Sequence, residues 1–107
     1  IGAIAGVAFI DGASEEVIDN TIIGALCTLS GTICDGAKSS CATKIAGGID
    51  AAWTAYQMAK NGDRIAAGDG ICKTDVEKTI KAIGRLCWEG MAQTDLTILD
   101  IMIGGDK

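Results

Sequence analysis

The feature that most constrains this chain is the complete absence of proline from its 107 residues. Proline interrupts helices more strongly than any other residue, because it lacks the backbone N–H and clashes with the preceding turn. The 15 glycines are therefore left to form helix ends and corners. No segment shows the sustained apolar–polar alternation of a strand. The sequence predicts an all-α fold, a compact bundle of about four to five helices in a single helical domain over residues 1–107.

Apolar residues at 3–4 spacing, together with capping residues, divide the chain into helices. The expected helices cover residues 1–10, 14–30, 39–61, 74–89 and 94–103. Asn61-Gly62 is expected to end the third helix in the left-handed conformation, and Gly104-Gly105 to end the last one. The expected N-caps are Ser14, Ser39 or Ser40, Thr74 (in a capping box with Glu77), and Thr94-Asp95. Trp53 and Trp88 are predicted to lie in the core.

The composition excludes several classes of function. Histidine is absent, so the chain alone offers no Ser-His-Asp triad and no histidine metal ligand. The net charge of −5 argues against a nucleic-acid-binding protein that relies on a basic surface. No uncharged stretch is a continuous apolar run of the ~20 residues that a membrane span needs. Together with the lack of a signal-peptide pattern, this predicts a cytoplasmic protein with neither nucleic acid nor membrane as partner.

Two of the five cysteines, Cys34 and Cys41, bracket a polar turn at Asp35-Gly36. The odd number of cysteines argues against a disulfide framework. Thiolates around such a loop can bind zinc or an iron–sulfur cluster, because the loop's N–H groups steady the charge on sulfur. On spacing alone, however, small buried residues are favoured over metal ligands, since free cysteine is among the most buried residue types.

A resemblance to a known family changes that weighing. The string ICDGAKSSCA at residues 33–42, followed by Lys44-Ile45, resembles the cysteine loop of the iron–sulfur-dependent L-serine dehydratase α-chain and L-cysteine desulfidase family. Residues 1–8, 83–91 and 94–102 also resemble that family, so the similarity covers nearly the whole chain in register. The cysteine loop is the specific motif, and the other stretches support it.

The resemblance implies a lyase that converts L-serine or L-cysteine to pyruvate and ammonia without pyridoxal phosphate. It implies a four-iron, four-sulfur cluster held by three cysteines, of which the matching positions here are Cys34 and Cys41. The third ligand and the catalytic base would lie before Ile1, so no catalytic residue is assigned. Because the chain opens on Ile1 in helical pattern, we expect a piece of a longer polypeptide that is inactive alone and binds its cluster poorly. Its partners would be the remainder of that polypeptide or a companion subunit, and a small amino acid.

The other residues of the loop have candidate roles toward the substrate. Lys38 is expected to offset cluster charge or to meet the substrate carboxylate, against the alternative of a solvated lysine. Ser39 and Ser40 are expected to donate hydrogen bonds to cluster sulfides or substrate oxygens. Asp35 is either a turn-forming residue or a residue with a role in the chemistry of the site.

The remaining cysteines are expected to have no role in the reaction. Cys27 is predicted to be a core residue, with a substitute cluster ligand as the alternative. Cys72 and Cys87 are predicted to be structural or incidental.

Two other functions stay open at the level of sequence. The chain could be a helical interaction or redox module, in which Cys34 and Cys41 form a reversible disulfide and bind no metal. A structural zinc site is a third hypothesis, and it needs two further ligands. The sequence does not decide between serine and cysteine as substrate, and it leaves a homodimer open.

Overall fold

The computed structural model describes residues 1–104 and is all-helical over that range, with no strand. This confirms the predicted all-α fold and the number of helices. A single π-helical turn, η1, joins the last two α-helices. The elements are α1 (Gly2–Ile10), α2 (Glu15–Leu29), α3 (Ser39–Lys60), α4 (Val76–Arg85), η1 (Leu86–Gly90) and α5 (Ala92–Met102).

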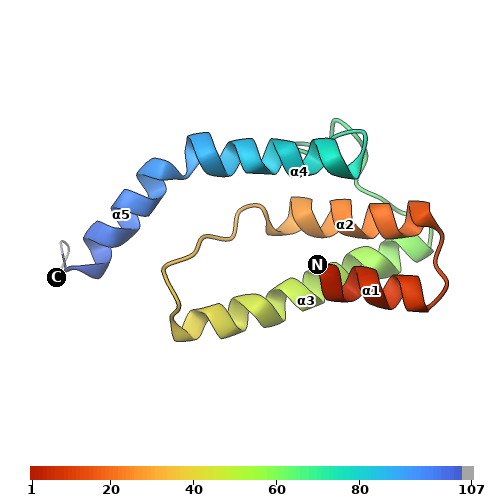
Figure 1. Cartoon of the computed structure of the whole chain (residues 1–107), viewed down its shortest axis with the longest axis horizontal. Helices are drawn as coiled ribbons and strands as arrows, with labels where there is room; N and C mark the ends of the chain where they lie inside the picture. Colours follow the sequence, from red (N-terminus) through yellow and green to blue (C-terminus); the bar gives the residue numbers. More distant parts are fainter. Residues whose placement is uncertain (105–107) are drawn as a thin grey trace.

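The helices α1, α2 and α3 pack together and enclose the core, and α4 lies against the other side of α2 (Figure 1). The residues in this core cluster are mostly small: Ile4, Ala8, Ala25, Ala52, Ala55 and Tyr56. The hydroxyl of Tyr56 donates a 2.8 Å hydrogen bond to Asp11 Oδ2. That bond anchors α3 to the turn that follows α1.

The helix α5 lies away from this core. Among the described helices it contacts only η1, and Figure 1 shows it extending from the end of α4 toward the far end of the molecule. The molecule therefore measures 51 × 28 × 16 Å. No helix in residues 1–104 combines the length and the apolar character needed to cross a lipid bilayer.

Two predicted helix ends are confirmed. Ser14 caps α2, and its side chain accepts a 3.3 Å hydrogen bond from the Val17 amide. Gly62 follows the end of α3 with φ +82°, the left-handed conformation expected of a glycine at that position. Gly104 also has a positive φ of +95° after α5. Gly105, the second residue of that predicted stop, lies outside the described residues.

Three predicted N-caps are wrong by one to three residues. Lys38 occupies the N-cap position of α3, and Ser39 and Ser40 are the first two residues of that helix. Asp75, not Thr74, caps α4 by accepting a 2.8 Å hydrogen bond from the Lys78 amide. The helix α5 begins at Ala92, so Thr94 and Asp95 lie inside its first turn rather than before it.

Both tryptophans lie outside the core, which corrects the sequence prediction. Trp53 is 46% exposed and Trp88 is 86% exposed. Trp53 still contacts Tyr56 edge to face, with ring centroids 5.8 Å apart. For Trp53 the physical reason is the close approach of α2 and α3, because a Cβ added at Gly24 would lie 3.0 Å from Ala55 Cβ. Helices this close leave room between them only for small side chains.

Candidate functional site

The cysteine loop connects α2 to α3 and is open to solvent along most of its length. Gly36 has φ +79°, so the Asp35-Gly36 dipeptide forms a turn as predicted. Cys34 is exposed before this turn, and Cys41 is half-buried in the first turn of α3. The backbone amide of Cys41 donates a 2.9 Å hydrogen bond to the Lys38 carbonyl.

Asp35 ties the loop to the beginning of α3. Its Oδ1 atom lies 3.1 Å from Lys44 Nζ and accepts a 3.3 Å hydrogen bond from Ser40 Oγ. The hydrogen bond from Lys44 is the largest of the effects that lower the pKa of the Asp35 carboxyl. Asp35 is therefore an anionic anchor for the loop as well as a turn residue, and it holds Ser40 and Lys44 near the cysteine turn.

An open groove of about 350 Å³ lies between this loop and α5. Cys34, Asp35 and Gly36 line it from the loop, and the facing wall comes from α5. The α5 residues are Asp95, Ile98, Leu99 and Met102. Sequence reasoning did not place α5 at the loop, and the only signal for it was the family resemblance of residues 94–102.

The structure brings only part of the predicted site to this groove. Cys34 lines it, whereas Cys41 does not. Lys38 and Ser39 are exposed at the first turn of α3, and Ser40 is bound to Asp35. None of these three side chains lines the groove, so their contact with substrate stays a prediction.

The donor chemistry of the loop suits a cluster, but the number of donors is too small. Among residues 1–104, no group of three or more histidine, cysteine, aspartate or glutamate side chains is placed to hold a metal ion. Cys34 and Cys41 carry soft sulfur donors of the kind that iron–sulfur clusters use. The two cysteines fit an iron–sulfur cluster only if further ligands come from outside this chain.

The other three cysteines lie away from the loop. Cys72 is buried, and its Sγ atom donates hydrogen bonds to the Ile65 and Lys73 carbonyls at 3.4 and 3.5 Å. Cys27 is half-buried, and burial together with the neighbouring Cys72 thiol raises its pKa. A raised pKa keeps Cys27 in its thiol form, which favours the core interpretation over a substitute ligand. Cys87 is exposed on η1. All five cysteines are free.

Comparison with known proteins identifies similar chains. The family described as "Serine dehydratase alpha chain" matches residues 1–100. A UPF0597 protein of Finegoldia magna is 46% identical over 103 residues, which are 96% of this chain and 25% of that protein. A UPF0597 protein of Lachnoclostridium phytofermentans is 47% identical over 102 residues, 95% of this chain and 24% of that protein. The chain thus spans about a quarter of the length of these relatives. No solved structure matches it.

Proposed function

Because the chain belongs to the serine dehydratase alpha chain family, we propose that it forms the C-terminal, cluster-binding part of an amino-acid lyase. The proposed substrate is L-serine or L-cysteine, and the products are pyruvate and ammonia. The observation that carries the proposal is the family match over residues 1–100, which includes the whole cysteine loop. The relatives are about four times as long as this chain, which supports a larger catalytic unit.

In this proposal Cys34 and Cys41 hold two positions of a four-iron, four-sulfur cluster. The open iron of such a cluster supplies a Lewis acid that polarises the β-substituent of the amino acid. The exposure of Cys34 supports this role, because an exposed thiol can share a cluster with ligands outside the chain. The third ligand and the catalytic base would come from the remainder of the polypeptide or from a companion subunit.

The groove beside Cys34 would then form one wall of the substrate site. Lys38 and Ser39 are exposed near it and would contact the substrate carboxylate and its other oxygens. The pair between Asp35 and Lys44 would hold the loop in place as the substrate binds. A cytoplasmic location suits a cluster that oxygen damages, and it belongs to the same proposal.

The test compares three cysteine variants in the longer polypeptide, reconstituted anaerobically with iron and sulfide. Cys34→Ser and Cys41→Ser should each remove the brown charge-transfer absorption and the formation of pyruvate. Cys87→Ser is the matched control, because Cys87 is also exposed but lies on η1 away from the loop. It should retain colour, iron content and activity. The 107-residue chain alone should bind the cluster poorly and produce no pyruvate.

Two outcomes would contradict the proposal. Full colour and activity in the Cys34→Ser and Cys41→Ser variants would remove both cysteines from the site. A colourless protein with a reducible Cys34–Cys41 disulfide would instead support a redox module.

A further inference from the structure

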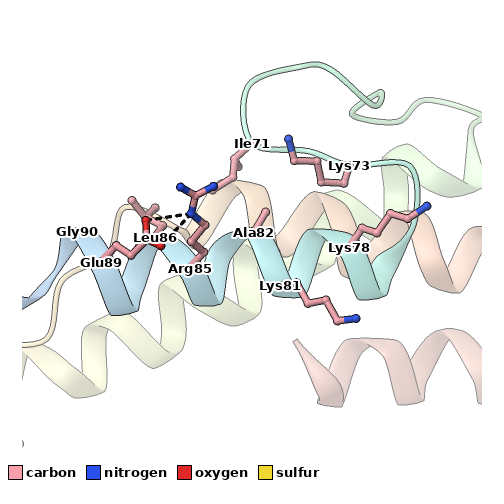
Figure 2. Close-up of a pocket in the computed structure, with 9 residues that line it drawn as sticks. All are labelled: Ile71, Lys73, Lys78, Lys81, Ala82, Arg85, Leu86, Glu89 and Gly90. Atoms are coloured by element: carbon pink, nitrogen blue, oxygen red, sulfur yellow. Dashed lines mark hydrogen bonds and ion pairs between the residues drawn. The ribbon is translucent and has the colours of Figure 1, made fainter.

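A second groove lies beside α4, where the segment carrying Ile71 and Lys73 runs along that helix (Figure 2). Its volume is about 710 Å³. It shares no residue with the groove beside Cys34. The class of ligand that it could bind is therefore inferred from its own side chains.

Positive charge is concentrated in this groove although the chain as a whole is acidic. Four of the nine lysines and arginines line it, namely Lys73, Lys78, Lys81 and Arg85, against one carboxylate, Glu89. Three of the four cations lie on α4 at spacings of three, four and seven residues, which places them on one helical face. Like charges at such spacings destabilise a helix, and a bound anion would relieve that repulsion.

Two of these four cations form ion pairs. Lys78 pairs with Asp75 at 3.0 Å, and Arg85 donates through Nε to Glu89 at 2.9 Å. Within residues 1–104, Lys73 and Lys81 form no ion pair.

The unpaired groups lie on both sides of the groove. Figure 2 shows the Lys73 and Arg85 head groups on either side of Ile71, while the Lys81 side chain extends from α4 in the opposite direction. In the described part of the chain, no group accepts a hydrogen bond from the two terminal nitrogens of Arg85. Ammonium and guanidinium groups in this state are suited to bind phosphate oxygens.

The floor of the groove is apolar. Ala82 and Leu86 line it on the helical side, Ile71 adds an apolar side chain at the edge (Figure 2), and Leu86 is 41% exposed. The volume lies within the ~300–1,000 Å³ range of small-molecule sites. We propose that this groove binds an organic phosphate, whose phosphates contact Lys73, Lys81 and Arg85 and whose apolar or aromatic body covers Ala82 and Leu86.

The proposal is tested with ATP as the probe, by calorimetry at low salt and by the amide NMR spectrum of the purified chain. Saturable binding should shift amides within residues 71–90. A Lys73→Gln/Lys81→Gln double variant should bind ATP at least tenfold more weakly. Lys60→Gln is the matched control, since Lys60 lies over the Tyr56 ring, 5.1 Å from its centroid and outside the groove. Its affinity should stay within twofold of the unmodified chain.

Two further ligands distinguish the contribution of the phosphates to binding from that of the organic body. Tripolyphosphate carries the phosphates without the organic body, and citrate carries carboxylates instead of phosphates, so both should bind more weakly than ATP. Equal binding of either one overturns the proposal. So does the absence of saturable binding, an unchanged affinity in the double variant, or amide shifts confined to residues outside 71–90. The shift map uses the unmodified chain, so it remains decisive if the double variant fails to fold.

Discussion

Thr79 is the residue that joins α4 to the segment before it. It is fully buried, and its Oγ1 atom donates a 2.8 Å hydrogen bond to the Asp75 carbonyl. The same oxygen accepts a 3.2 Å hydrogen bond from the Lys73 amide. One hydroxyl thus satisfies a carbonyl in the helix and an amide in the loop, which fixes the path of the chain along the edge of the second groove.

Replacing Thr79 with valine keeps the shape of the side chain but leaves the Lys73 amide without its partner. We expect Thr79→Val to lower the free energy of unfolding by about 0.5–1.5 kcal/mol, the net contribution of a typical hydrogen bond. Urea denaturation followed by circular dichroism measures the change. Thr97→Val is the control, because the Thr97 hydroxyl also donates to a helix carbonyl but is exposed. A loss of the same size in both variants would contradict this account.

The exposure of the tryptophans shows what apolar periodicity leaves undetermined. The 3–4 pattern predicts one apolar face of α3, and its members Ala52, Tyr56 and Ala59 are buried, whereas Ile45 and Ile49 are exposed. It also assigned Trp53 to that face, because periodicity records spacing and takes no account of the space between two helices. That space is set by the contact of Gly24 with Ala55, two residues far apart in the sequence.

At the scale of elements, the contact between α2 and α3 depends on the glycine of α2. Because a Cβ at Gly24 would lie 3.0 Å from Ala55 Cβ, Gly24→Ala requires α3 to yield by a few tenths of an ångström at this contact. Overpacking typically costs ~1–3 kcal/mol, and the better helix propensity of alanine returns up to ~1 kcal/mol. We therefore expect a net loss of unfolding free energy of up to ~2 kcal/mol, measured by urea denaturation.

Gly47 in α3 is the matched control for Gly24. It is also inside a helix, but a Cβ there meets no atom within 4 Å. Gly47→Ala should therefore raise the free energy of unfolding by about 0.5–1 kcal/mol. If the two substitutions stabilise the chain equally, α2 and α3 do not touch at Gly24.

The helices themselves were predictable, while several of their first residues were not. Thr74 and Asp75 both carry an oxygen that can cap α4, and the sequence pattern favoured the threonine because Glu77 completes a capping box. In the structure Asp75 takes the position, with Lys78 Nζ 3.0 Å from its Oδ2 atom. Side-chain contacts such as this ion pair decide which of two adjacent residues caps a helix, and the spacing of residues in the sequence does not reveal them.

At the scale of the whole molecule, the helices differ in how extensively they pack against the rest of the described chain. The core lies among α1, α2 and α3, whereas α5 contacts no helix-forming segment except η1 and keeps Leu96 61% exposed. Segments with few buried contacts open at lower free energy than the core. Amide hydrogen exchange should therefore be slowest in α2 and α3 and fastest in α5. Equal protection across all five helices would contradict this order.

The candidate site was only partly predictable for a related reason. Cys34 and Cys41 could be singled out because they bracket a turn within one short segment. The approach of Asp95 and Met102 to that turn depends on the path of the chain through α3, α4 and η1. No local sequence pattern encodes such a path. The cysteine loop could therefore be predicted from the sequence, whereas the position of α5 opposite it could not.

The π-helical turn η1 determines which side of α5 meets the cysteine loop. Each residue added to or removed from a helix rotates everything after it by about 100°. The wide turn at Leu86–Gly90 thus sets the rotation of α5 about its axis, and with it the direction in which Asp95 and Met102 face Cys34. A change of one residue in the length of this turn would rotate the α5 wall away from the cysteine loop without altering any side chain of the groove. The geometry of the groove therefore depends on residues that do not line it.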